Sequence, residues 1–227
     1  FAVAPPGAFT SAMSDAKKTT LQLILWPSIL TLLVNVGRVV GQKQGWITTA
    51  SGGGFAWFGI TWLGFLFGAW FAYRLRRSGS TPRRAFWWPL LSLLAVLGVA
   101  VWQFSGIDRA DTSEAAMEPL RNAVLSVTAI ALAMALVQFA VWPRLAWTLL
   151  AYAVPARLTV LALTWLAKSQ GWDSHYTKFG PAGIEREMAE TMQSAAVAQL
   201  GFWVPLTIIV GTLVGCLLAG RPAKKPS

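Results

Sequence analysis

Long apolar blocks separated by short polar segments run through most of the chain. Each block approaches the roughly 20 residues that an α-helix needs to cross about 30 Å of hydrocarbon. Six such blocks predict membrane-spanning helices over about residues 21–41, 55–75, 86–104, 122–141, 146–167 and 196–220. The expected fold class is therefore all-α: a polytopic integral membrane protein in which residues 19–220 form a six-helix transmembrane bundle.

The polar segments between these blocks predict loops and tails. Residues 1–18 are expected to form a flexible N-terminal tail, since Pro5, Pro6 and Gly7 disfavour regular structure. Residues 105–120 predict an exposed acidic loop, and residues 168–195 a turn-rich loop followed by a helix along the membrane surface. Residues 221–227 predict a basic C-terminal tail, because prolines prevent further helix there.

The distribution of Lys and Arg orients the predicted bundle. With six spans, one set of loops and termini holds eleven basic residues and the other holds six. The richer set includes both tails and the segment Arg74–Arg84, which carries five arginines. Because cytoplasmic loops carry the excess of basic residues, we expect both termini and this segment on the cytoplasmic side of a bacterial inner membrane.

Composition narrows the expected partners. Hydrophobic residues make up 55% of the chain and charged residues 12%, which is about half the charge content of a soluble domain. The net charge of +10 is explained by the orientation signal, so no nucleic-acid partner is expected. The expected partners are the lipid bilayer, anionic lipids at Arg74–Arg84, and other membrane proteins or further copies of this chain.

Two arginines inside predicted spans are the sharpest candidates for function. Arg157 falls near the middle of the fifth span and Arg38 in the outer part of the first. An Arg at the bilayer centre costs roughly 2.5–3.5 kcal/mol on insertion scales, so it should face other helices, water or a ligand. The predicted spans contain no Asp or Glu. Cation-coupled transport is therefore disfavoured, because such carriers usually keep a carboxylate or His relay in their spans.

Amide and hydroxyl groups are the remaining candidate partners for Arg157. These are Asn35, Gln138, Gln199 and Tyr152. Arg38 and Arg157, with Asn35, Gln138 and Gln199, predict an anion or lipid-phosphate site that opens to the outside. The alternative is that Arg157 only pairs within the bundle or fixes helix register.

A second candidate site lies in the outer loop that includes Gly171-Trp172-Asp173-Ser174-His175-Tyr176. Asp173, His175 and Glu185 supply the carboxylates and the imidazole that a metal site or a general base uses. A single His without an HxxxH, HExxH or CxxC partner is more typical of a hydrogen-bonded loop residue. No metal, no cofactor and no catalytic residue is therefore predicted.

Two pairs of glycines predict close helix packing. Gly64 with Gly68, and Gly211 with Gly215, form GxxxG motifs in the second and sixth spans. Small residues at this spacing let two helices approach closely, most simply within the chain.

A weak internal echo also runs through the chain. Trp26-Pro27 and Gln44-Gly45-Trp46 recur as Trp142-Pro143 and Gln170-Gly171-Trp172. The echo fits either a duplicated helix pair or the shared composition of membrane helices.

The Trp26-Pro27 start, Arg157 and the segment Gly171–Tyr176 resemble a group of uncharacterised bacterial membrane proteins with about six helices. The resemblance implies the fold and brings no activity. Three hypotheses for function follow: an accessory, scaffold or assembly subunit of a membrane complex; a carrier, channel or lipid-binding protein with an anion site at Arg38 and Arg157; or a membrane enzyme that uses Asp173 and His175.

Overall fold

The computed structural model describes residues 6–50, 60–107, 113–179 and 186–219, with side chains described from Thr20 on and not at 114–116. This part of the chain is helical and contains no strand. Its elements are α1 (Pro6–Lys43), α2 (Leu63–Arg77), α3 (Trp87–Phe104), α4 (Glu114–Val141), α5 (Pro143–Ser169), a 3₁₀ turn η2 (His175–Thr177), α6 (Met188–Ala196), a π-helix η3 (Val197–Trp203) and α7 (Val204–Ala219).

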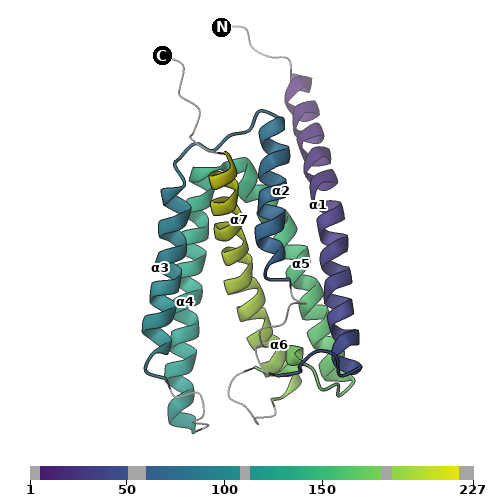
Figure 1. Cartoon of the computed structure of the whole chain (residues 1–227), viewed down its shortest axis with the longest axis vertical. Helices are drawn as coiled ribbons and strands as arrows, with labels where there is room; N and C mark the ends of the chain where they lie inside the picture. Colours follow the sequence, from purple (N-terminus) through teal and green to yellow (C-terminus); the bar gives the residue numbers. More distant parts are fainter. Residues whose placement is uncertain (1–5, 51–59, 108–112, 180–185, 220–227) are drawn as a thin grey trace.

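The helices form an elongated bundle in which α1 to α5, and then the continuous helix of α6, η3 and α7, alternate in direction (Figure 1). α7 lies at the centre of the bundle and contacts α2, α3, α4 and α5, whereas α1 packs mainly against α5. α1 begins and α7 ends at the same end of the bundle (Figure 1). We call this end the basic end, since the arginines of α2 and of the segment Arg74–Arg84 lie there.

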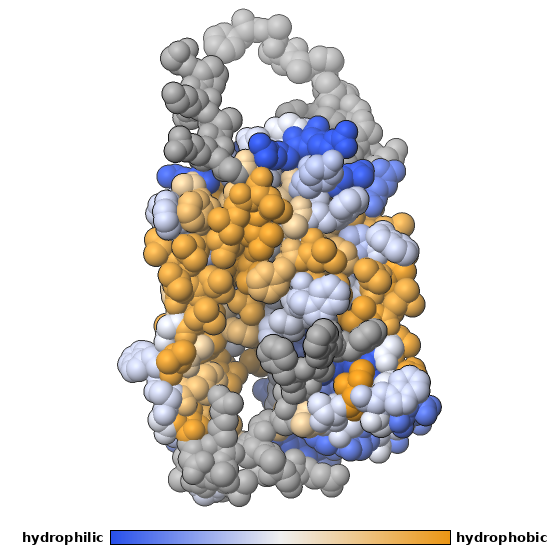
Figure 2. All heavy atoms as spheres, viewed as in Figure 1, coloured by the Kyte–Doolittle hydropathy of each residue, from blue (hydrophilic) through white to orange (hydrophobic). Residues whose placement is uncertain are grey.

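Five described stretches are long and apolar enough to cross a membrane: Thr20–Lys43, Trp87–Phe104, Met117–Val141, Pro143–Ser169 and Met188–Ala219. Large apolar side chains also cover the outside of the bundle; Trp26, Val101 and Leu136 are each more than 60% exposed. Figure 2 shows a broad apolar band across the visible face of the molecule, with hydrophilic residues gathered toward its ends. Such a surface needs lipid around it, and the chain is a multi-pass helical membrane protein.

The boundaries of the third and fifth predicted spans lie close to those of α3 and α5. The second predicted span is represented by α2, whose 15 residues cover about 22 Å, less than the hydrocarbon thickness. Residues 55–59 of that predicted span lie outside the described residues.

Three predicted segments differ from the structure. The tail expected over residues 1–18 is helical from Pro6 on, because a proline is tolerated in the first turn of a helix. The acidic loop is shorter than expected, since α4 already begins at Glu114. The helix expected along the membrane surface is instead the start of one continuous helix, Met188–Ala219. Thr191 and Ala195 are buried there, so this segment packs into the bundle.

The close approach of α2 and α7 involves the predicted glycines. A Cβ atom on Gly68 would lie 2.5 Å from the Gly211 Cα, so the two backbones touch. A Cβ on Gly211 would lie 2.5 Å from Leu149, and one on Gly215 would lie 2.6 Å from Leu145, both in α5. We call the contact of Gly64, Gly68, Gly211 and Gly215 with their neighbours the glycine seam; at Gly68 it leaves no room for a side chain between α2 and α7.

The turn between α4 and α5 closes the basic end. Trp142 is fully buried, and its indole N–H donates a hydrogen bond of 2.9 Å to Ser80 Oγ. The backbone N–H of Arg83 donates to the carbonyl of Val141 at 2.7 Å. These hydrogen bonds hold the arginine-rich segment against the bundle, so the basic end is well packed.

Candidate functional site

A cavity of about 290 Å³ lies between α1, α5, η3 and the loop that follows α5. Part of its lining comes from the loop that follows α5, at the end of the bundle opposite to the basic end (Figure 1). The lining residues are Asn35, Arg38, Ile60, Thr61, Arg157, Val160, His175, Tyr176, Lys178, Phe179, Ala198, Gln199 and Trp203. The cavity therefore brings Arg38, Arg157, Asn35 and Gln199 together, as predicted, and adds the His-Tyr loop to them.

Arg157 is the most deeply placed charge in this cavity. It lies about 18 Å along α5 from the end of that helix at Ser169, and it is 6% exposed. Its Nη1 donates a hydrogen bond of 3.3 Å to Gln199 Oε1, and its Cζ lies 5.1 Å from the centroid of the Trp203 ring. A guanidinium has five N–H donors. Gln199 accepts one of them, and among the described residues no carboxylate forms an ion pair with Arg157.

The π-helix η3 presents Gln199 and Trp203 to Arg157. It interrupts the α-helical pattern between α6 and α7, and single π-helical segments of this kind occur often at functional sites. Gly201, inside η3, faces α4, where a Cβ would lie 2.7 Å from Thr128 Cγ2. The glycine lets the π-helix approach α4 while its other side lines the cavity.

Asn35 and Tyr176 line the cavity together with the two arginines and bind each other. The Tyr176 hydroxyl donates to Asn35 Oδ1 at 3.4 Å, and Asn35 Nδ2 donates to Thr159 Oγ1 at 3.1 Å. Burial raises the pKa of Tyr176 to about 12, against the opposing effect of the positive charges of Arg38 and Arg157. The phenol is therefore a neutral hydrogen-bonding group that lies within electrostatic reach of both guanidinium groups.

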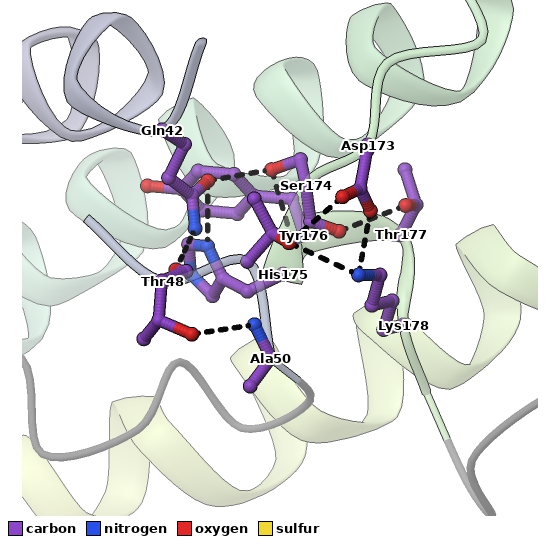
Figure 3. A network of polar contacts seen from close by, with 10 residues as sticks. Gln42, Thr48, Ala50, Asp173, Ser174, His175, Tyr176, Thr177 and Lys178 are labelled. Atoms are coloured by element: carbon purple, nitrogen blue, oxygen red, sulfur yellow. Dashed lines mark hydrogen bonds and ion pairs between the residues drawn. The ribbon is translucent and has the colours of Figure 1, made fainter. Parts of the chain in front are cut away.

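The loop over residues 172–178, which we call the strap, fastens α5 to α1 (Figure 3). Gln42 is its anchor on α1. The Gln42 amide oxygen accepts from Ser174 Oγ at 2.8 Å and from His175 Nδ1 at 3.1 Å, while its Nε2 donates to the Thr48 carbonyl at 2.7 Å. Lys43 adds a cation–π contact, with Nζ 3.7 Å from the centroid of the Trp172 ring.

The same type of helix cap ends both helices that the strap joins. Gly45 and Gly171 have positive φ values of 72° and 62°, which glycine adopts without strain. Trp46 N–H donates to the Gly41 carbonyl at 2.8 Å, and Trp172 N–H donates to that of Ala167 at 2.9 Å. This is the Schellman pattern, and it accounts for the repeated Gln-Gly-Trp. The Trp-Pro part of the echo differs, since Pro27 lies within α1 and Trp142 between two helices.

His175 lines the cavity as a neutral side chain. Burial, assisted by the positive charge of Arg38, lowers its pKa to about 3. Because Gln42 offers an amide oxygen to Nδ1, the ring proton lies on Nδ1. His175 therefore contributes hydrogen bonding and no positive charge to the cavity at neutral pH.

Asp173 and His175 are directed to different partners. The Asp173 carboxylate is 69% exposed, forms an ion pair with Lys178 and accepts from Thr49 Oγ1 at 2.8 Å. The hydrogen bonds from Lys178 and Thr49 lower its pKa. The structure thus does not assemble the acid–imidazole pair predicted for this loop, and Glu185 lies outside the described residues. Residues 6–50, 60–107, 113–179 and 186–219 contain no group of three potential metal ligands.

Of the other predicted partners of Arg157, Tyr152 lies within electrostatic reach of it, whereas Gln138 lies elsewhere. Gln138 Nε2 donates to Ser92 Oγ at 3.0 Å and to the Met134 carbonyl at 2.8 Å, between α3 and α4. The Tyr152 hydroxyl shares a hydrogen bond of 2.7 Å with Thr31 Oγ1. Sequence spacing indicates how deep a residue lies in the membrane but not which neighbour its helix face meets, so Gln138 was misassigned.

Among the lining residues that sequence reasoning missed are Tyr176, Trp203 and Lys178. Tyr176 directly follows His175, and Trp203 follows Gln199 by four residues on the same helix. These two spacings in the sequence are the features from which Tyr176 and Trp203 could have been predicted as lining residues. The loop was expected to stay at the outer surface, so its inward fold could not be anticipated.

The charge of the lining has one sign. Of the described lining residues, Arg38, Arg157 and Lys178 are basic, and none is Asp or Glu. Lys178 is compensated by Asp173 at the outer edge. Comparisons with family models, curated proteins and solved structures find no match to the chain, so its chemistry has to be inferred from this geometry.

Proposed function

We propose that this protein binds an anionic ligand in the cavity framed by Arg38 and Arg157. The observation that carries the proposal is the burial of Arg157, 6% exposed, with an amide oxygen and an aromatic ring as its closest partners. A buried charge is costly unless a counter-charge or several hydrogen bonds compensate it. An oxyanion would supply both, because a guanidinium forms paired hydrogen bonds with carboxylate and phosphate oxygens.

We further propose that the protein crosses a bacterial inner membrane six times, with α2 as the sixth span and both termini in the cytoplasm. The basic residues gathered at the end where α1 begins and α7 ends support this orientation (Figure 1). The cavity would then face the outer leaflet and the periplasm. The protein would be an outward-facing carrier, or a receptor for an anion on that side.

Anion binding is tested by thermal unfolding and direct titration of the purified chain in detergent, with sodium phosphate, sulfate and acetate against matched sodium chloride. We expect an oxyanion to raise the midpoint of unfolding of the wild type, and the Arg157→Gln variant to lose that increase. Gln138→Leu is the matched control, since it removes a buried amide outside the cavity. Equal responses in the wild type and Arg157→Gln, or no response to any anion, would contradict the proposal.

Orientation is tested with single-cysteine reporters in a Cys216→Ala background. Ser78 lies after α2 at the basic end, and Ser169 lies at the opposite end of α5. A membrane-impermeant maleimide added to intact cells should label Ser169→Cys and spare Ser78→Cys until the membrane is opened. The reverse pattern would place the cavity on the cytoplasmic side.

The scaffold hypothesis remains a prediction that competes with ligand binding. It is favoured if Arg157→Gln abolishes co-purification of a partner protein while no oxyanion binds to the wild type. It is rejected if the variant keeps its partners and its fold and loses only anion binding.

A further inference from the structure

The outer face of α2 changes from apolar to aromatic to basic toward the basic end. Leu66, Trp70, Tyr73 and Arg77 follow one another at helical spacing, so they share one side of the helix. All four side chains are exposed. Another side of α2 is buried in the glycine seam against α7. The exposed side therefore faces away from α7, toward the lipid around the bundle.

Two arginines of α2 lie back over the aromatic rings of this face. Arg74 Cζ is 5.3 Å from the centroid of the Trp70 ring, and Arg77 Cζ is 5.8 Å from that of Tyr73. Arg77 Nη1 also donates a hydrogen bond of 3.2 Å to the Tyr73 hydroxyl. Each ring precedes its arginine by one helical turn, so both guanidinium groups lie nearer to the apolar band than their own Cα atoms.

The position of these guanidinium groups is informative, because a long basic side chain at a membrane surface usually extends toward water. Arg74 and Arg77 are instead held beside Trp70 and Tyr73. Exposed Trp and Tyr residues gather at the level of the lipid headgroups. The two positive charges therefore lie at the depth at which lipid phosphates occur.

We propose that α2 binds the phosphate of an anionic phospholipid between Arg74 and Arg77, with the acyl chains along Leu66 and Trp70. The site is separate from the anion cavity and does not depend on the proposed function. Of the five arginines in Arg74–Arg84, for which the sequence predicts anionic lipids, these two make the specific contact.

The charges of this face favour an anionic lipid over a zwitterionic one. Neither Arg74 nor Arg77 forms an ion pair with a carboxylate of the described residues, and residues 60–107 contain no Asp or Glu. Residues three positions apart are neighbours on a helix, so one phosphate can accept hydrogen bonds from both guanidinium groups. A zwitterionic lipid would bring its ammonium group close to the same two positive charges, which repel it.

The other arginines of the segment are placed differently. Arg76 lies on another side of α2, where its Nη1 donates a hydrogen bond of 3.2 Å to the Leu218 carbonyl near the end of α7. Arg83 and Arg84 are exposed beyond the end of α2. This last pair provides a control, because its removal takes the same charge from the same end of the bundle without changing the face of α2.

The test compares the double variants Arg74→Gln/Arg77→Gln and Arg83→Gln/Arg84→Gln. The probes are dioleoylphosphatidylglycerol and dioleoylphosphatidylcholine, titrated against the full chain in neutral detergent and followed by native mass spectrometry. We expect the wild type to bind the phosphatidylglycerol about tenfold more tightly than the phosphatidylcholine. The α2 variant should lose this preference, and the control variant should keep it.

The contribution of the rings is tested with Trp70→Leu, which keeps an apolar side chain and removes the ring beside Arg74. We expect the preference for phosphatidylglycerol to fall by about threefold. Arg74→Gln and Arg77→Gln are also measured singly, and each should reduce the preference by about the same factor; they keep the test decisive if the double variant does not fold.

Equal loss of the preference in the two double variants would overturn the proposal, since the lipid would then respond to the net charge of the basic end. Equal affinity of the wild type for both lipids would also overturn it. Arg157→Gln should keep the full preference; its loss there would place the lipid phosphate in the cavity instead of on α2. None of the first two results bears on anion binding in the cavity, which is tested separately.

Discussion

The continuous helix Met188–Ala219 has two regions that are built in opposite ways. In its α7 part, Gly211 and Gly215 pack so tightly against α2 and α5 that added Cβ atoms would overlap their neighbours. In its η3 part, Gln199 and Trp203 border an open cavity with buried arginines. Close packing stabilises a membrane protein through dispersion contacts, whereas open space and the burial of a charge such as Arg157 destabilise it. The glycine seam is therefore expected to stabilise the folded protein, whereas the cavity is expected to bind a ligand.

The largest effect is expected from Gly68→Ala in the glycine seam. The new methyl group would lie 2.5 Å from the Gly211 Cα and 2.9 Å from its carbonyl oxygen, so one backbone must move. We expect a loss of about 3 kcal/mol in the free energy of unfolding, measured by denaturant titration in micelles. The matched variant Gly64→Ala should cost much less, because its nearest neighbour, Thr207, would be 3.7 Å away. Equal losses would show that the seam does not depend on the Gly68–Gly211 contact.

Lowering the pH should destabilise the strap at the cavity at pH values that leave the glycine seam unaffected. The pKa of His175 is lowered from 6.5 to about 3 in the folded protein, so between these values the unfolded chain binds a proton that the folded chain does not. Stability is fully present above pH 6.5 and falls as the pH decreases, by at most about 1.4 kcal/mol per pH unit. Because the side chain is only partly buried, we expect a loss of about 2 kcal/mol between pH 6.5 and 4.5.

The control for the acid effect is His175→Gln, measured by thermal unfolding over the same range of pH. Asp173, whose pKa is lowered from 3.8, loses its contribution only below that range. A flat pH dependence from 6.5 to 4.5 in His175→Gln is expected. An unchanged slope in the variant would assign the titration to another group.

A smaller effect is expected where the strap meets α1. Gln42→Ala removes the amide that accepts from Ser174 and His175 and donates to the Thr48 carbonyl. We expect a loss of about 1.5 kcal/mol, together with faster amide hydrogen exchange confined to the strap. Exchange that increases equally in α2 and α7 would show that the strap and the glycine seam unfold as one unit.

The smallest expected effect has the opposite sign. Arg157→Met replaces a buried charge with an apolar side chain of similar length, which should raise the free energy of unfolding of the ligand-free protein by about 1 kcal/mol. The measurement is denaturant titration in phosphate-free buffer. A loss of stability would show that Arg157 is a structural residue, and the contrast between the two regions would then be wrong.

The sequence was sufficient to predict the helices that are long and uniformly apolar. α3 and α5 end within a few residues of the prediction, because Phe86-Trp87, Pro143 and Ser169 coincide with sharp changes in polarity. The ends of α1 and α4 were less predictable. Helices continue beyond the hydrocarbon wherever the flanking residues are good helix formers, and hydropathy does not record that.

The candidate site was predictable in its charges and less so in its shape. Arg38 and Arg157 stand out because charges within spans are rare. The position of Gln138, against Ser92, depends on how α4 is rotated, which no local pattern determines. The strap carries His175 and Tyr176 inward because Gln42 and Asn35 of α1 bind them, and contacts between residues more than 130 positions apart are not visible in the local sequence.

The π-helix between the two regions has a consequence for helical phase. A π turn accommodates more residues than an α turn, so η3 changes the angular register between α6 and α7. An uninterrupted α-helix would fix the direction of Gln199 once Gly211 is docked on Gly68. With the π-helix between them, the direction of Gln199 is no longer determined by the docking of Gly211 alone. Insertions or deletions of one residue within 197–203 would therefore reorient Gln199 and Trp203 relative to Arg157 while the glycine seam keeps its alignment.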